Sequence, residues 1–243
     1  MQHKHQRDDF LKKYHETRTQ FLDGKDQEKL KWFRRYFDTV YATYFKKVGR
    51  DKAILELGCN KGYLLNVLAE EGYTNLVGVD LSEGDIEVAR RLNPGATIIQ
   101  EDIFTFLEKM PESFDVILLK ALIEHIEKDR IMELLEKIHR ALKQGGFILI
   151  DVYNADWVFT QHDRYMDFTH EVGFTQESLK QVMVFFYKDV SVTPVSGLIF
   201  NSARRFLCTV SRKILKKLLE FLVDPDLKEM ALFERVLIGY GKK

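Results

Sequence analysis

Short apolar runs alternate with amphipathic stretches through the middle of this chain. The runs predict buried strands, and apolar residues at every third or fourth position between them predict helices. Because the two alternate repeatedly, we expect an α/β fold, a mostly parallel sheet with helices on both faces. Gly145 and Gly146 are expected to end the last helix. The runs are 53–57, 76–80, 97–99, 114–119 and 147–152, and the helical stretches are 63–71, 83–92 and 131–142.

The pattern changes on either side of this alternating region. Before it, apolar positions at helical spacing over residues 30–48 predict an N-terminal helical cap. After it, a stretch without a clear period predicts a long loop, followed by a helix, a strand, an amphipathic helix and a final strand. We therefore expect a cap at 1–50 and a core domain at 51–243, with a loop at 153–174, strands at 188–194 and 235–240 that complete a seven-stranded sheet, and a helical insertion at 197–230.

The composition is that of an ordinary folded protein. Apolar residues make up 45% of the chain and charged residues 30%, which excludes a disordered chain, a fibrous repeat and a membrane bundle. Basic and acidic residues both number 37, so no net field favours nucleic acid. The two cysteines, Cys59 and Cys208, exclude a disulfide framework and favour a cytoplasmic location, and we expect no signal peptide at the start.

A glycine-containing loop follows the first predicted strand. Gly58 and Gly62, separated by three residues, open a helix at the carboxyl end of that strand, where parallel sheets bind ligands. The dinucleotide pattern G-x-G-x-x-G fails, because Asn60 and Tyr63 stand at its second and third glycine positions. The loop therefore favours a small ligand without a closely held pyrophosphate, and it argues against an NAD-dependent dehydrogenase.

Two aspartates follow the next two strands. Asp80 ends the second strand, about twenty residues beyond the loop, where a carboxylate can accept both hydroxyls of a ribose. Asp102 follows the third strand and can accept from an exocyclic amine. Each aspartate taken singly is more often a helix cap or a turn residue, but together with the loop they favour a nucleoside site.

In their order and spacing, these features resemble the class I S-adenosylmethionine-dependent methyltransferases, which have a Rossmann-like fold. The resemblance covers roughly residues 50–153, and Asn60 departs from it because the family usually has glycine there. The segments that carry it are 56–62, 79–80, 101–103, 114–117 and 142–146.

The resemblance implies S-adenosylmethionine as the methyl donor and suggests roles for single residues. Asp80 would hold the ribose, and Asp102 would face the adenine amine. Leu81 and Ile103 would pack on the adenine ring, while Glu56 would orient the loop and the ammonium group of the ligand. The expected cofactor-binding residues are Glu56, Gly58, Asn60, Gly62, Asp80, Leu81, Asp102, Ile103 and Lys120.

His125 is the first candidate on the acceptor side. Residues 120–126 resemble a segment of the ubiquinone-biosynthesis O-methyltransferases in which two acids and a histidine occur together. Here Ala121 replaces the first acid, and Glu124 with His125 alone makes a poor metal site, so we expect no metal. Two interpretations of His125 remain open, as support for a helix beside the cofactor or as a catalytic base.

The loop at residues 156–170 is the second candidate, because long loops in compact domains are often lids or binding loops. His162, Asp167 and His170 are its candidate catalytic bases. The alternative is a well-packed loop whose histidines and aspartates satisfy one another.

A further resemblance concerns the acceptor. Residues 164–170 and 174–179 are similar to a methyltransferase subgroup associated with bacterial cell-surface polysaccharide and glycolipid assembly. We therefore expect O-methylation of a sugar hydroxyl in a glycan or glycolipid. The alternatives are a methyltransferase of another small molecule, with a quinone-like or nitrogen acceptor, and a non-catalytic subunit that binds S-adenosylmethionine.

A cationic amphipathic helix is expected at residues 198–223, where no acid precedes Glu220. One interpretation is a helix packed on the domain with a solvated basic face. Another is peripheral contact with the inner face of a membrane, which would suit a lipid-linked acceptor. Nucleic-acid binding is not expected, because the whole chain is neutral.

Overall fold

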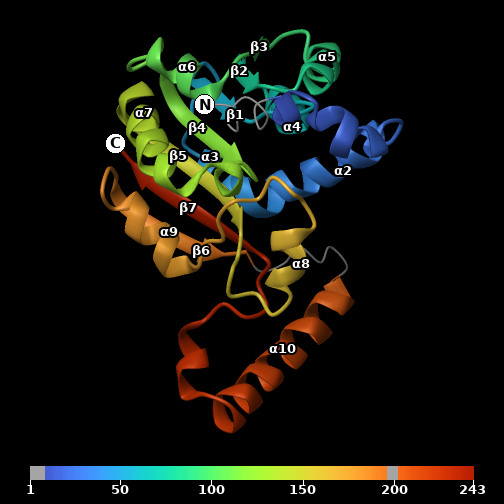
Figure 1. Cartoon of the computed structure of the whole chain (residues 1–243), viewed down its shortest axis with the longest axis vertical. Helices are drawn as coiled ribbons and strands as arrows, with labels where there is room; N and C mark the ends of the chain where they lie inside the picture. Colours follow the sequence, from blue (N-terminus) through green and yellow to red (C-terminus); the bar gives the residue numbers. More distant parts are fainter. Residues whose placement is uncertain (1–8, 196–201) are drawn as a thin grey trace.

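A seven-stranded sheet forms the centre of the molecule in the computed structural model, which describes residues 9–195 and 202–243 (Figure 1). The strand order is β3-β2-β1-β4-β5-β7-β6; neighbours from β3 to β5 are parallel, and β7 runs antiparallel to β5 and β6. The predicted α/β class with a mostly parallel sheet is confirmed. The strands are β1 (Ala53–Leu57), β2 (Asn75–Asp80), β3 (Thr97–Gln100), β4 (Phe114–Lys120), β5 (Leu142–Tyr153), β6 (Lys188–Pro194) and β7 (Val236–Lys242).

Helices cover both faces of the sheet, and each face has its own apolar core (Figure 1). Strand β1 shows how the faces divide. Leu55 and Leu57 belong to the apolar cluster that contains residues of α6, α7 and α9, whereas Ile54 belongs to the one that contains residues of α2, α4 and α5, because side chains alternate along a strand. The helices are α2 (Asp26–Tyr36), α4 (Tyr63–Glu70), α5 (Glu83–Leu92), α6 (Ile103–Glu108), α7 (Ile131–Ala141) and α9 (Gln176–Met183).

The N-terminal helical region runs without a break from Asp26 to Phe45, in line with the single helix that the apolar spacing over residues 30–48 predicts, but it contains a π-helical turn. A π-helical segment, η3 (Phe37–Tyr41), separates α2 from α3 (Ala42–Phe45). The hydroxyls of Tyr36 and Tyr41 donate to the same oxygen, Oδ2 of Asp151, at 2.6 and 2.5 Å. The two tyrosines are five residues apart, and the i→i+5 spacing of a π-helix brings such residues onto one side. Burial in the core thus decides the helix geometry here.

Strand β5 begins earlier than the sequence predicts. Gly145 and Gly146 do not cap α7 but lie inside β5, because the backbone at Leu142 is already extended, with ψ 138°. A Cβ at Gly146 would lie 2.8 Å from the carbonyl oxygen of Asp115. Glycine therefore serves a close approach between β4 and β5 rather than the end of a helix.

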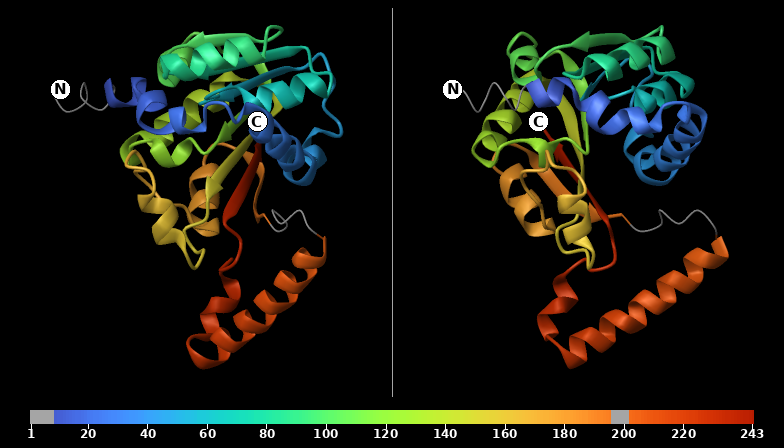
Figure 2. Two further views of the ribbon diagram at one scale, coloured as in Figure 1. Left: turned by 90° about the vertical axis from the view of Figure 1, so that its right-hand side faces the viewer. Right: turned by 45° about the vertical axis from the view of Figure 1, so that its right-hand side comes forward.

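After β5 the chain forms two further helices, a short one and a long one, in addition to α9. The predicted loop at 153–174 contains α8 (Thr160–Tyr165). Between β6 and β7 lie α10 (Ser202–Leu222) and η6 (Pro225–Glu229), and Figure 2 shows α10 standing away from the sheet. The predicted start of this helix, at 198–201, lies outside the described residues. Among the described helices, none has the length and apolar character needed to cross a bilayer.

Candidate functional site

A cavity of about 360 Å³ opens at the carboxyl ends of β1, β2 and β4. One side is formed by residues that follow β1, β2 and β3, and the opposite side by residues that follow β4 and α8. A third wall comes from residues 9–24, called the N-terminal segment below. Side chains expected to bind a cofactor and side chains expected to act on an acceptor therefore share one cavity.

The loop after β1 adopts the strained backbone that its glycines predict. Gly58, Asn60 and Gly62 all have positive φ, at 67°, 48° and 71°. Asparagine tolerates this region better than most residues, which explains how Asn60 replaces a glycine. Gly58 and Asn60 line the cavity, whereas Gly62 does not: a Cβ there would lie 2.5 Å from Asn93 Nδ2 on the far side.

Asp80 ties the loop to the end of β2. Its Oδ2 accepts from the backbone N–H of Asn60 at 2.8 Å, and its Oδ1 accepts from that of Ser82 at 2.9 Å. Burial raises the pKa of Asp80 to about 6, although these two donors act in the opposite direction. The carboxyl is therefore mostly ionised at neutral pH and keeps further lone pairs for a ligand.

Asp102 lies in the same cavity and also caps a helix. Its Oδ1 accepts from the backbone N–H groups of Phe104 and Thr105, at 3.1 and 3.0 Å, at the start of α6. This is the capping role that an aspartate in this position often has. Oδ2 accepts no hydrogen bond from the described residues, and Leu81 and Ile103 line the cavity nearby.

Glu56 and Lys120 form the inner end of the cavity. Burial raises the pKa of Glu56 to about 8, and its Oε2 has no partner among the described residues. Lys120 Nζ lies 2.9 Å from Asp151 Oδ2 and 4.1 Å from the centre of the Tyr36 ring. Asp151 is not among the residues predicted from the sequence; its signal there is a single carboxylate within the otherwise apolar run 147–152.

Three side chains of the acceptor side gather across the cavity. His125 comes from η4 (Ile123–His125), and Asp167 and His170 come from the segment after α8. The two imidazole rings lie 4.6 Å apart between centroids. Burial would raise the pKa of Asp167, but hydrogen bonds from Tyr14 and Thr169 hold it at about 2. Asp167 is therefore an ionised anchor and a weak base.

Hydrogen bonds define the tautomers of both imidazoles. His170 Nδ1 lies 2.8 Å from the carbonyl oxygen of Asp163, which can only accept, so Nδ1 carries the hydrogen. The Thr169 hydroxyl donates to Asp167 Oδ1 and lies 2.7 Å from His125 Nδ1, so this Nδ1 also donates. In each neutral ring the basic lone pair is then on Nε2.

The N-terminal segment reaches the acceptor side through two residues that the sequence analysis did not single out. The Tyr14 hydroxyl donates to Asp167 Oδ2 at 2.6 Å, and Arg18 Nε lies 3.5 Å from the same oxygen. Tyr14 and Arg18 are four residues apart on one helical face, which is the only sequence signal for the pair. Their partner is 153 residues from Tyr14 along the chain, so only the fold reveals the contact.

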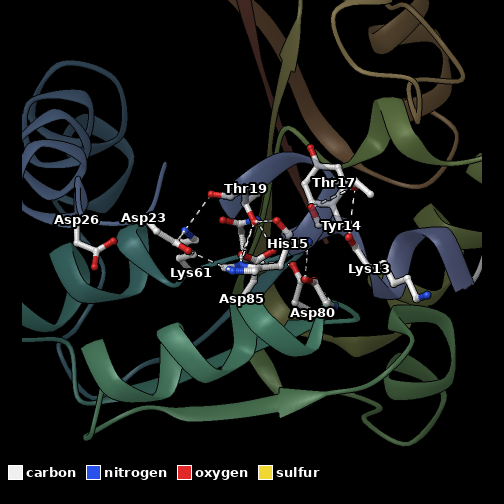
Figure 3. A network of polar contacts seen from close by, with 12 residues as sticks. Lys13, Tyr14, His15, Thr17, Thr19, Asp23, Asp26, Lys61, Asp80 and Asp85 are labelled. Carbon is white, nitrogen blue, oxygen red and sulfur yellow. Dashed lines mark hydrogen bonds and ion pairs between the residues drawn. The ribbon is translucent and has the colours of Figure 1, made fainter. Parts of the chain in front are cut away.

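A second set of contacts holds the N-terminal segment against α5 and the loop that precedes α4 (Figure 3). Asp85 Oδ1 accepts from the Thr19 hydroxyl at 2.7 Å and lies 2.9 Å from His15 Nδ1. The fully buried Lys61 donates to the carbonyl oxygen of Thr19 at 3.1 Å and pairs with Asp23. This clamp fixes one wall of the cavity, because Thr19 itself lines it.

Two further acceptor-side residues lie outside the cavity. His162 is exposed on α8 and does not line it. Glu124 is buried beside His125, and neither of its carboxyl oxygens has a hydrogen-bond partner among the described residues. Burial raises the pKa of Glu124 to about 8, so the side chain is mostly neutral at pH 7.

His125, Asp167 and His170 have the donor types of a metal site. Their ligand atoms lie within 4.8 Å of one another, and no other group among residues 9–195 and 202–243 does this. Asp167, however, already accepts three hydrogen bonds, from the Tyr14 hydroxyl and from the N–H and hydroxyl of Thr169. That arrangement favours a carboxylate that orients imidazoles, and the absence of a metal stays a prediction.

Comparison with known proteins adds independent information. A family model described as "Methyltransferase domain" matches residues 27–193. A ubiquinone biosynthesis O-methyltransferase from Pseudomonas aeruginosa is 30% identical over 109 residues, which are 43% of this chain and 46% of that protein. One from Idiomarina loihiensis is 28% identical over 179 residues, 64% of this chain and 68% of that protein. The chain thus spans about half the length of the first of these relatives.

Solved structures share the fold at low sequence identity. An S-adenosylmethionine-dependent methyltransferase from Archaeoglobus fulgidus has a TM-score of 0.65 at 19% identity, covering 88% of this chain and 94% of that one. The plantazolicin methyltransferase BpumL, in complex with S-adenosylhomocysteine, has a TM-score of 0.60 at 21% identity, covering 96% and 93%. At these identities the similarity concerns the fold.

Proposed function

Since the chain belongs to the methyltransferase-domain family, as the match over residues 27–193 shows, we propose that it methylates a hydroxyl of a small-molecule acceptor. It is an S-adenosylmethionine-dependent methyltransferase, with S-adenosylmethionine as methyl donor. The pair of imidazoles opposite the expected cofactor residues supports a hydroxyl acceptor. A hydroxyl must lose its proton during transfer, and imidazole is a suitable base near neutral pH.

The residues of the cavity fit this donor. The Glu56 carboxyl, whose Oε2 has no partner among the described residues, would be ionised and satisfied by the ammonium group of a ligand. We propose that Asp80 holds the ribose hydroxyls and that Asp102 Oδ2 faces the adenine amine. The other proposed contacts that line the cavity are Gly58, Asn60, Leu81, Ile103 and Lys120.

We propose His170 as the base. When bound, S-adenosylmethionine supplies an electrophilic methyl group. His170 Nε2 would take the acceptor proton, while Nδ1–H stays on the Asp163 carbonyl and keeps the ring in place. His125 would be held beside it through Thr169. Asp167 is too weak a base, with a pKa of about 2, and acts as a positioning residue.

The acceptor class we propose is a sugar hydroxyl of a glycan or glycolipid. The resemblance of residues 164–170 to polysaccharide-associated methyltransferases supports it. So do the exposed rings of Tyr165 and Phe168, 74% and 92% accessible, which lie outside the cavity lining but next in sequence to Met166 and Asp167 within it, and which a sugar can stack against. A phenolic hydroxyl is the second candidate, because the curated relatives are named ubiquinone biosynthesis O-methyltransferases.

Transfer of a labelled methyl group tests both acceptor classes. The protein is incubated with labelled donor and either sugar or catechol acceptors, and products are identified by mass spectrometry. We expect His170→Ala to lower kcat by about 10²–10⁴-fold. The matched control is His162→Ala, an exposed histidine of the same segment, which should keep wild-type turnover. If His125→Ala abolishes turnover and His170→Ala does not, the base is His125; if neither matters, the acceptor atom is not a hydroxyl.

A further inference from the structure

Helix α10 turns its apolar side toward solvent. Five large apolar residues follow one another at spacings of three and four, so they form one stripe along the helix. Their exposed fractions run from 41% to 86%, which is unusual for side chains of this size. The residues of this apolar stripe are Leu207, Val210, Ile214, Leu218 and Phe221.

The opposite side of α10 faces the rest of the protein. Cys208, Arg212, Lys216 and Leu219 are half-buried and share a second helical face. Lys216 Nζ donates to two backbone carbonyl oxygens in and after η6, those of Lys228 at 2.9 Å and of Met230 at 2.7 Å. With about 100° of rotation per residue, the two faces lie on nearly opposite sides of the helix. The helix thus uses this second face for contact with η6, and the described residues leave its apolar stripe uncovered.

Positive charge borders the apolar stripe. Lys213 and Lys217 are exposed, and each neighbours the stripe on the helical surface. Residues 202–222 contain six basic side chains and a single acid, Glu220. Any partner that buries the apolar stripe must therefore also be compatible with the positive charges of Lys213 and Lys217 beside it.

We propose that α10 lies on an anionic bilayer, with its apolar stripe inserted at the level of the lipid headgroups and its lysines against their phosphates. A helix with these two features suits that interface. A second copy of the chain fits less well, because pairing two stripes would bring cationic margins together. This inference goes beyond methyl transfer and does not depend on it.

Vesicle flotation tests the proposal. The full chain is mixed with vesicles of phosphatidylcholine alone, or of phosphatidylcholine and phosphatidylglycerol in equal parts. We expect binding to the anionic vesicles, weakened by salt. Ile214→Glu with Phe221→Glu, and separately Lys213→Glu with Lys217→Glu, should each weaken binding about tenfold or more.

The matched control is Val184→Glu with Phe185→Glu, which charges two other exposed apolar residues, 53% and 74% accessible, after α9. It should bind vesicles like the wild type, and thermal stabilisation by S-adenosylhomocysteine should show that all variants are folded. Equal binding by the α10 variants and the control would overturn the proposal. So would a lack of binding together with a dimer, seen by light scattering, that Ile214→Glu with Phe221→Glu dissociates; a second copy would then cover the stripe.

Discussion

At the scale of single residues, burial raises the pKa of each carboxyl near the site and hydrogen-bond donors lower it, so the balance of the two sets its charge. Asp167 accepts three hydrogen bonds, and its pKa is held at about 2. Asp80 receives backbone donors on both oxygens and has a pKa of about 6. Glu124 has no partner on either oxygen, and its pKa rises to about 8. Asp167 is therefore an ionised anchor, Asp80 a ligand group and Glu124 a neutral core residue, although all three are carboxyls.

Asp80 carries the first prediction. Asp80→Asn should remove most of the increase in melting temperature that S-adenosylhomocysteine gives, because a ligand that binds only the native state stabilises it. In the wild type, affinity should fall as the pH drops through about 6, where the carboxylate becomes protonated. Thermal denaturation with and without ligand measures both effects. Asp51→Asn, an exposed aspartate, is the control, and an unchanged ligand effect in Asp80→Asn would place the ribose elsewhere.

Glu124 carries a prediction about stability and pH. Its pKa is about 8 in the folded protein and about 4.3 in an unfolded chain, so the native state holds an extra proton between these values. The free energy of unfolding should therefore fall as pH rises from about 4 to 8, by up to about 1.4 kcal/mol per unit. Glu124→Gln should flatten this dependence in denaturant titrations. The exposed Glu136→Gln should leave it unchanged; equal slopes in all three proteins would contradict the prediction.

At the scale of elements, the N-terminal segment connects the two sides of the cavity. It is held on α5 through Asp85 and contacts the acceptor side through Tyr14 and Arg18. The cofactor wall and the acceptor wall consequently share one element. Loosening the N-terminal segment should therefore disturb both the cofactor wall and the acceptor wall.

Asp85→Asn tests this coupling. It weakens the charge-assisted contacts to His15 and Thr19, each worth about 1.5–3 kcal/mol. Amide hydrogen exchange over residues 13–20 should become about tenfold faster or more, and S-adenosylhomocysteine should bind more weakly. Glu87→Gln, an exposed acid on the same helix, should change neither. Unchanged exchange in Asp85→Asn would show that other contacts hold the segment.

At the scale of the whole molecule, two distant parts of the chain form one histidine and aspartate cluster, and a third contacts it through Tyr14, which raises the question of a metal. Because hydrogen bonds from Tyr14 and Thr169 already occupy Asp167, we expect methyl transfer to survive chelation. Activity before and after EDTA treatment measures this, with metal content checked by mass spectrometry. Loss of activity that Mg²⁺ or Mn²⁺ restores would assign His125, Asp167 and His170 as metal ligands.

The sequence by itself determined the sheet, most of its helices and the loop after β1. These depend on local signals: apolar periodicity, glycines at positive φ and acids at strand ends. The structure predicted from the sequence differs from the observed one where packing overrides local preference. Gly146 serves a strand contact rather than a helix end, and the helix expected at 30–48 contains a π-helical turn that places two tyrosines on Asp151.

Only the tertiary structure decided the acceptor side and the surface of α10. The contact of Tyr14 with Asp167 joins residues 153 positions apart, and no local pattern encodes which distant groups will share a cavity. The exposure of His162 and the burial of His170 likewise follow from how the segment folds back on β5. For α10, periodicity predicts an amphipathic helix, but the contact of Lys216 with η6 decides which side faces the protein. Which face of an element is buried depends on what packs against it, and that is a property of the whole fold.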